Sequence, residues 1–248
     1  MDKKLEFILP KVNKPARYTG GEFGQVIKNK SEMNTRFVFC FPDTYEIGMS
    51  NLGMHILYGA LNAIPDVWCE RSFTPWVDME REMRNENIPL FALESGDPLK
   101  QFDFIGFSVQ YELSYTNILT MLDMGGVEIF AKERKNNAPL VIGGGCCTYN
   151  SEPFAEIFDL IVIGEGEEVL IEIVELYKKH KSNFDRNEFL LQAAQIEGVY
   201  VPKFYEFSYE DGKISSLTVA EGVPKKIVKR YIKDLDKSYY PIIANRSG

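Results

Sequence analysis

A short apolar run that leads into a turn-forming loop is the feature that most constrains this fold. Residues 37–41 are apolar and of strand length, and residues 42–48 contain a proline, an aspartate and a glycine. A continuous apolar run of this length is typical of a parallel strand that is buried on both faces. Because open α/β sheets bind ligands beyond the carboxyl ends of their strands, the loop at 42–48 is a candidate ligand-binding segment.

Strand and helix patterns alternate from this run to about residue 180. The predicted strands are residues 36–41, 67–72, 90–93, 102–109, 139–142 and 160–163, and the predicted helices are residues 48–64, 77–87, 114–125 and 168–180. Such alternation is typical of a doubly wound parallel sheet with helices on both faces. We therefore predict an α/β domain of flavodoxin-like (Rossmann-like) fold over residues 35–182.

Different patterns flank this domain. Residues 1–34 contain two prolines, at positions 10 and 15, and residues 20–24 contain three glycines. This composition predicts an irregular arm, either flexible or docked on the core. Residues 185–195 have a helical pattern, and the segments on either side of Asp211 and Gly212 alternate as strands do. An Asp-Gly pair is a strong hairpin signal. Residues 183–248 are thus expected to form a small antiparallel β appendage.

Charge and hydropathy exclude two classes of partner. The net charge of −8 argues against general nucleic-acid binding, which depends on basic surface. No apolar run approaches the roughly 20 residues that a membrane-spanning helix needs. The chain starts without an apolar segment of signal-peptide type. We therefore expect a cytoplasmic protein without a membrane partner.

The cysteines give no metal-binding pattern. Cys40, Cys69, Cys146 and Cys147 lack the C-x-x-C spacing of zinc and cluster sites, and the sequence has only two histidines. We predict no metal site. Cys40 lies in the apolar run and is expected in the core. Cys146 and Cys147 follow a glycine run, where reactivity or ligand contact is open, although packing is the favoured interpretation.

Three further loops are expected at the same edge of the sheet as the loop at 42–48. They are residues 108–110, 143–147 and 164–167. Glycines let a ligand approach the backbone, and the helix starts beyond them offer unpaired N–H groups. No catalytic residue is predicted. Carboxylates that open a helix, such as Glu167 and Glu168, usually complement its dipole, and Ser108 has no G-x-S-x-G context.

These loops carry a resemblance to a known family. Residues 43–48 (DTYEIG), 108–110 (SVQ) and 141–144 (VIGG) fall in the order and spacing of the cobalamin-binding motifs D-x-H-x-x-G, S-x-L and G-G. Residues 149–153 (YNSEP) and 159–167 resemble the cobalamin-binding-type amino-terminal domain of radical S-adenosylmethionine (SAM) proteins. Residues 17–22 (RYTGGE) look like one uncharacterised subfamily of these proteins. The likeness extends from about residue 17 to residue 240.

The resemblance implies an accessory domain that holds a corrinoid over a catalytic barrel. On this basis the cofactor-binding residues would be Asp43, Tyr45 and Gly48 in the lower loop, Ser108, Gln110, Gly143, Gly144 and Gly145 at the buried cofactor tail, and Glu165 and Gly166 facing the barrel. The [4Fe–4S] cluster and SAM would bind only in that barrel, because the C-x-x-x-C-x-x-C motif is absent from this sequence. The barrel is the expected partner. The basic segment 225–233 and the end at 245–248 fit a linker toward it.

Two positions depart from the family pattern. Tyr45 occupies the place of the cobalt-ligating histidine, and Gln110 occupies the place of a leucine. Imidazole is a good cobalt ligand, whereas a neutral phenol is a poor one. A corrinoid would therefore bind without a histidine from this loop.

Two other functions fit the same residues. One is a non-catalytic interaction module that retains the fold and binds no cofactor. The other is a flavodoxin-like nucleotide- or flavin-binding protein with a phosphate on the loop at 43–48. As an accessory domain, this stretch of chain is not expected to catalyse a reaction alone.

Overall fold

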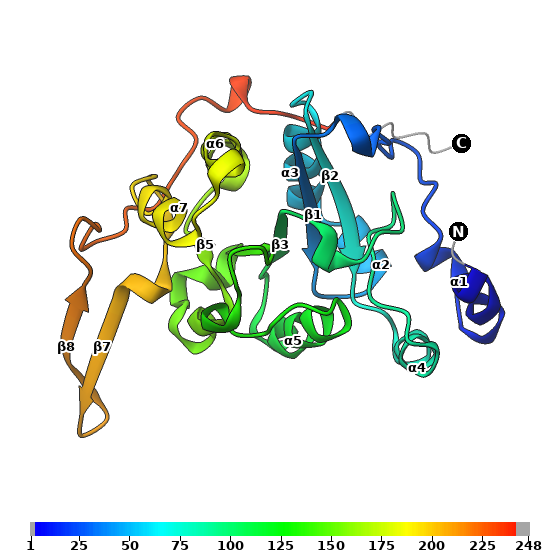
Figure 1. The fold of residues 1–248 in the computed structure, drawn as a ribbon, viewed down its shortest axis with the longest axis horizontal. Helices are drawn as coiled ribbons and strands as arrows, with labels where there is room; N and C mark the ends of the chain where they lie inside the picture. Colours follow the sequence, from blue (N-terminus) through cyan, green and yellow to red (C-terminus); the bar gives the residue numbers. More distant parts are fainter. Residues whose placement is uncertain (1–2, 242–248) are drawn as a thin grey trace.

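A computed structural model describes residues 3–241 and contains a large central sheet and a separate hairpin (Figure 1). The central strands are β1 (Thr35–Phe41), β2 (Val67–Phe73), β3 (Phe104–Ser108), β4 (Leu140–Gly144), β5 (Leu160–Val162) and β6 (Val199–Tyr200). They lie in the order β2-β1-β3-β4-β5-β6, with parallel pairing except between β5 and β6. The predicted α/β sheet is confirmed, and its first five strands have the flavodoxin-like order.

Helices cover both faces of this sheet. They are α1 (Lys3–Ile8), α2 (Tyr45–Met49), α3 (Leu52–Asn62), α4 (Val77–Glu86), α5 (Tyr115–Met124), α6 (Gly166–His180) and α7 (Arg186–Ala193). Buried residues of α3, α6 and α7 belong to one hydrophobic cluster, and those of α1, α4 and α5 belong to another. Figure 1 shows α3, α6 and α7 on one side of the sheet and α4 and α5 on the other. None of the described helices is long and apolar enough to cross a membrane.

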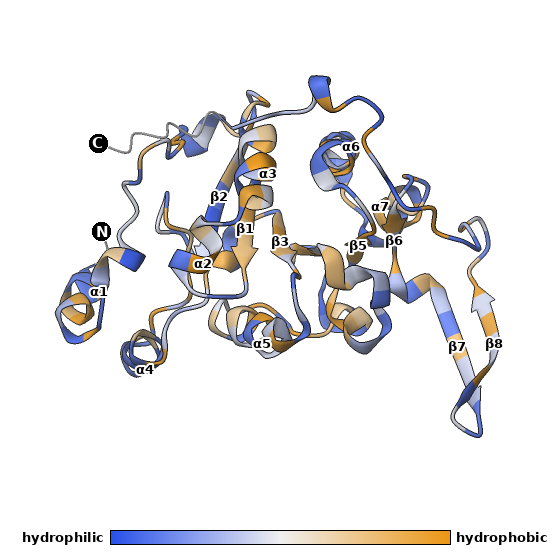
Figure 2. Ribbon diagram, turned by 180° about the vertical axis from the view of Figure 1, so that it is seen from behind, coloured by the Kyte–Doolittle hydropathy of each residue, from blue (hydrophilic) through white to orange (hydrophobic). Residues whose placement is uncertain are grey.

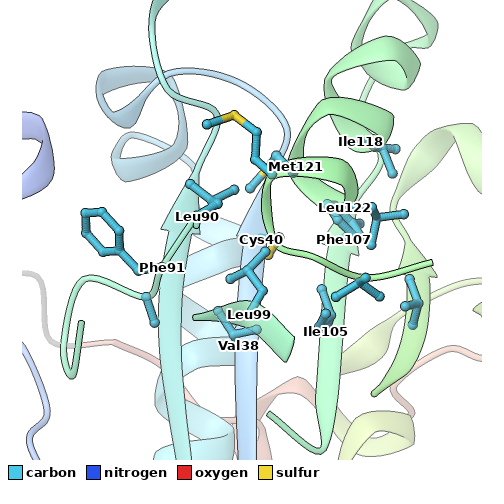
Figure 3. Close-up of a cluster of buried hydrophobic side chains, with 14 of the residues drawn as sticks. Val38, Cys40, Leu90, Phe91, Leu99, Ile105, Phe107, Ile118, Met121 and Leu122 are labelled. Carbon is cyan, nitrogen blue, oxygen red and sulfur yellow. The ribbon is translucent and has the colours of Figure 1, made fainter. Parts of the chain in front are cut away.

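Strand β1 contributes side chains to both hydrophobic clusters. Phe37 and Phe39 point to the face covered by α3, whereas Val38 and Cys40 point to the opposite face. Because β2 and β3 flank β1 and helices cover both faces, the whole strand is buried, as its apolar run predicts. Figure 2 shows hydrophobic residues concentrated on β1 and α3. Figure 3 shows the other face, where Val38, Cys40, Ile105 and Phe107 lie near Ile118, Met121 and Leu122 of α5.

The prediction of a strand at residues 90–93 is wrong, because this segment forms a loop. Leu90 and Phe91 are buried, but this segment makes only an isolated bridge between Phe91 and Pro98. Its amides bond to scattered carbonyls, with Leu90 N donating to Met124 O at 2.8 Å and Leu93 N donating to Arg71 O at 2.8 Å. The segment therefore covers the sheet as a loop that satisfies its backbone groups without joining the strand ladder.

Two predicted element boundaries also need correction. The helix predicted at residues 48–64 is divided into α2 and α3, because the side chain of Asn51 accepts a hydrogen bond from Met54 N and starts a new helix. The arm, predicted to be irregular, contains the short helix α1, whose Leu5 and Ile8 pack in the hydrophobic core. Residues 1–2 of the predicted arm and 242–248 of the predicted linker lie outside the described residues.

The predicted carboxyl-terminal appendage is partly integrated with the main sheet. Strand β6 extends this sheet, and α7 buries Phe189 and Leu190 against it. The predicted hairpin is confirmed as β7 (Tyr205–Glu210) and β8 (Lys213–Val219), with Asp211 and Gly212 at φ values of 50° and 72°. It projects away from the rest of the molecule (Figure 1).

Strand β2 lies at the edge of the sheet, but a charge network helps to cover it. Arg71 Nε lies 2.7 Å from a carboxylate oxygen of Glu94, and Arg71 Nη2 lies 3.0 Å from Glu22 of the arm. The side chains of Arg71 and Glu94 are almost fully buried. An exposed strand edge invites pairing with another chain, so this cover protects the sheet.

A second network gives a pH-dependent contribution to stability. Burial opposes ionisation of Asp97, but hydrogen bonds from Lys30 and Arg36 outweigh this effect and lower its pKa. A carboxyl with a lowered folded-state pKa stabilises the fold at neutral pH, and this contribution is lost as the pH falls through that pKa. We therefore expect wild type to exceed Asp97→Asn in unfolding free energy at neutral pH. Denaturant titrations should show this difference shrinking below the ordinary aspartate pKa of about 3.9; a constant difference would contradict the prediction.

Candidate functional site

A cavity of about 200 Å³ lies at the carboxyl edge of the sheet, between the strands and helices α3 and α6. Its apolar surface is formed by Phe37, Phe39, Phe107, Ile142 and Val162 of the strands, Leu57 of α3 and Leu170 of α6. The chain runs from β1 outward to β2 and then returns to β3 on the other side of β1. The cavity touches both β1 and β3, and thus includes the switch point where open α/β sheets bind ligands.

Many of the predicted site residues line this cavity. They are Ser108, Gln110, Gly143, Gly144, Gly145, Glu165 and Gly166. They come from the loops that follow β3, β4 and β5, so the topology brings together residues up to 58 positions apart. Whether any of them binds a cofactor stays a prediction.

Glycines at the ends of the strands leave the cavity open. A Cβ added to Gly144 would meet no heavy atom within 4 Å, whereas one added to Gly106 would lie 2.6 Å from the Phe37 ring. The Phe37 ring therefore occupies the space over Gly106 in the middle of β3, and the space beside Gly144 remains free. The missing side chain at Gly144 is thus one cause of the hollow.

Gly145 fixes the turn beyond β4. Its φ is +111°, and an added Cβ would lie 2.6 Å from the carbonyl oxygen of Val109. Val109 N donates to Gly144 O at 2.6 Å, and Cys147 N donates to Val109 O at 3.1 Å. These contacts join the loops after β3 and β4 into one wall, and only glycine fits this close approach.

Polar groups of the loop after β3 lie at the same wall. Ser108 is buried, and its hydroxyl accepts a 2.5 Å hydrogen bond from the side-chain amide of Gln110. The cavity therefore offers neutral hydroxyl and amide groups beside its apolar surface. These groups can orient a ligand without requiring it to carry charge.

The loop after β5 is held by a distant segment of the chain. Gly164, at φ +113°, lies against Arg230, whose carbonyl accepts from Glu165 N at 3.1 Å. Arg230 also forms ion pairs with Glu168 at 2.8 Å and Glu172 at 2.6 Å on α6. The segment around Arg230, predicted only as a basic linker, thus supports one wall of the cavity. Its role depends on contacts some 60 residues apart, for which the sequence gives no local signal.

The three predicted residues of the loop after β1 do not line the cavity. Tyr45 packs edge-on against Phe73 of β2, with ring centroids 5.3 Å apart. Gly48 also packs against Phe73, since a Cβ there would lie 2.2 Å from the ring. Asp43 accepts hydrogen bonds from Thr44 N at 2.6 Å and from the Tyr111 hydroxyl. Tyr45 and Gly48 are therefore directed toward β2, whereas Asp43 contacts the loop after β3 outside the cavity lining.

The described residues offer no imidazole for a cobalt ion at this cavity. Burial, followed by the nearby Glu22 carboxylate, raises the pKa of Tyr45 to about 12, so its phenol is neutral. His55 lies outside the cavity lining, with Nε2 2.7 Å from Met49 O. No group of three or more potential metal ligands occurs among residues 3–241. The glycine-bordered apolar hollow suits a buried cofactor tail, but the donor set does not suit cobalt ligation.

Together these features define an α/β protein of flavodoxin-like strand order with a ligand-sized hollow at its switch point. The family described as radical SAM proteins, N-terminal, matches residues 53–202. This match includes most of the sheet and the cavity lining, and the chain belongs to this family. The predicted relation to radical SAM proteins is therefore confirmed at the level of the amino-terminal domain.

A relative has been found in an archaeon. The chain is 27% identical over 199 residues to the uncharacterized protein MJ0966 of Methanocaldococcus jannaschii. The similarity covers 75% of this chain and 38% of that relative, so the chain spans less than half of the relative's length. No solved structure matches the chain.

Proposed function

We propose that this domain holds a corrinoid in the cavity at the carboxyl edge of the sheet and presents it to a radical SAM catalytic domain. The observation that carries the proposal is the gathering of the loops after β3, β4 and β5 around one hollow. The family match supports the link to radical SAM chemistry. The sequence has no C-x-x-x-C-x-x-C motif, so the cluster and SAM would bind in the catalytic domain.

The apolar interior of the cavity suits the aromatic base at the end of a corrinoid tail. Phe39, Ile142 and Leu170 would contact this base, and the open side of Gly144 would let the tail pass close to the backbone. Ser108 and Gln110 would orient the polar part of the tail through hydrogen bonds. When bound, a corrinoid supplies a cobalt centre for radical-based chemistry, and this domain would contribute binding and orientation.

Charge disfavours the nucleotide- or flavin-binding alternative. Among the described residues, the lining contains Glu165 and Glu167 but no lysine or arginine. The loop proposed to hold a phosphate carries Asp43 and Glu46, and the nearby cations Lys14 and Arg17 already pair with Glu46 at 3.2 and 2.9 Å. The tail of a corrinoid also carries a phosphate, but as a diester with a single negative charge, so these carboxylates disfavour it less than a phosphate monoester.

The direct test is retention of a corrin spectrum. We expect the recombinant chain, mixed with hydroxocobalamin and then desalted, to retain the corrin absorbance in amounts comparable to the protein. Heat-denatured protein taken through the same steps is the control for non-specific retention. Absence of a retained corrin would contradict the proposal, and a flavin spectrum in the protein as purified would favour the flavodoxin-like alternative.

A non-catalytic interaction module is the second candidate. The hairpin exposes apolar side chains on one face, with Tyr209 60%, Ile214 59% and Leu217 44% exposed. Their pairing across the strands continues from Tyr205 and Val219, which pack on the core. Such a face is typical of a surface that contacts another protein. This candidate predicts no corrin retention together with binding of a partner that Tyr209→Ser and Ile214→Ser weaken.

A further inference from the structure

Two adjacent cysteines lie beside the rim of the cavity. Cys146 is exposed and Cys147 is partly buried, and both are free thiols in a 3₁₀ helix (Cys146–Asn150) that starts directly after Gly145. Cys146 Sγ donates to the backbone carbonyl of Gln110 at 2.8 Å. The amide of Cys147 donates to Val109 O at 3.1 Å. The pair is therefore held on the wall formed by the loops after β3 and β4.

The thiol of Cys147 lies beside that of Cys146 and is protonated at neutral pH. Burial, followed by Cys146 and Glu112, raises the pKa of Cys147 to about 11, and its thiol interacts with the thiol of Cys146 and the hydroxyl of Tyr115. No opposing basic side chain stabilises a thiolate of Cys147 among these contacts. Cys147 is therefore a weak nucleophile, since the thiolate is the reactive form.

Direct oxidation of this pair to a disulfide is geometrically unfavourable. Neighbouring Cα atoms across a trans peptide are about 3.8 Å apart, whereas disulfides usually join Cα atoms about 4.4–6.8 Å apart. No cis peptide occurs among the described residues. An atom inserted between the two sulfurs lengthens the bridge and removes the need for a direct S–S bond. The geometry thus favours a two-thiol chelate over a disulfide.

We propose that Cys146 and Cys147 form a binding site for a thiophilic trivalent arsenical at the rim of the cavity. With an organic arsenic oxide, two As–S bonds form and the arsenic–oxygen bond breaks. The oxygen leaves as water with the two thiol protons, and no oxidation state changes. Cys40 and Cys69 are buried on opposite faces of the sheet and cannot form such a chelate. This proposal does not rest on corrinoid binding.

Phenylarsine oxide, added to the full chain and followed by native intact-mass measurement, tests the proposal. We expect wild type to retain one phenylarsenic group that a small dithiol removes and a monothiol does not. Cys146→Ser and Cys147→Ser should each weaken retention about 100-fold, because the second As–S bond is intramolecular only in wild type.

The double variant Cys146→Ser/Cys147→Ser, with Cys40 and Cys69 intact, is the matched control and should retain none. Circular dichroism of each variant checks that the fold is unchanged. Equal retention by wild type and either single variant would overturn the proposal, and so would retention by the folded double variant.

Discussion

Replacing Asp159 by alanine is expected to lower the free energy of unfolding by about 3–5 kcal/mol. The Asp159 carboxylate is buried between two arginines, 2.9 Å from Arg134 Nη1 and 2.9 Å from Arg186 Nη2. It also accepts the amide of Val141 at 2.8 Å. Removing it leaves two guanidinium groups without their counter-charge in the interior, which costs far more than losing a surface ion pair.

Asp123→Ala is the matched control for this substitution. Asp123 pairs with Arg84 at 2.8 Å, but 54% of its side chain is exposed. Exposed ion pairs contribute about 0–1 kcal/mol, so this variant should stay close to wild type. Urea or guanidinium titrations monitored by circular dichroism measure both changes. Similar unfolding free energies for the two variants would contradict a structural role for Asp159.

Asp159 stabilises the fold at the edge of the sheet opposite the cavity. Asp159 immediately precedes β5, so it lies at the amino edge of the sheet together with Asp103, which precedes β3. Asp103 accepts hydrogen bonds from Tyr177 at 2.7 Å and from Arg36 N at 2.8 Å. The cavity lies at the opposite, carboxyl edge. The buried ion pairs can therefore hold the helices on the sheet without entering the cavity.

The sequence was sufficient to predict most of the main sheet, because apolar periodicity is a local property. The run at residues 37–41 predicts a doubly buried strand, and the Asp211-Gly212 pair predicts the hairpin turn. The segment 90–93 failed because a short apolar run does not reveal whether its amides meet a neighbouring strand. Here only Leu93 N reaches a strand, at Arg71 O of β2, whereas Leu90 N and Ala92 N bond to Met124 O and Asp97 O.

For the candidate site too, local patterns predict some features, whereas others depend on long-range packing. Parallel strands bring their carboxyl ends to one edge, so the topology alone predicts that residues such as Ser108, Gly144 and Glu165 approach one another. The direction of each loop depends on packing that the sequence does not reveal. Tyr45 and Gly48 pack against Phe73, and this contact joins helix α2 to strand β2. The support from Arg230 is a long-range contact of the same kind.

Gly144→Phe is expected to reduce hydroxocobalamin retention by at least about tenfold, which corresponds to about 1.4 kcal/mol of binding free energy. A Cβ at this position meets no atom within 4 Å, and Gly144 is not among the residues with positive φ. The new side chain can therefore extend from the cavity wall without a backbone clash. Absorbance after desalting measures retention, and denaturant titration should show stability within about 1 kcal/mol of wild type.

The neighbouring Gly145→Ala separates blocking of the cavity from damage to the fold. Gly145 has a φ of +111°, and its added Cβ would lie 2.6 Å from Val109 O. We expect this variant to lose about 1–3 kcal/mol of stability, because alanine is strained in this conformation. Gly144→Phe should thus lose the corrinoid while remaining folded, whereas Gly145→Ala should lose stability. If folded Gly144→Phe retains as much corrinoid as wild type, the ligand does not occupy this cavity, and the loops around it serve another purpose.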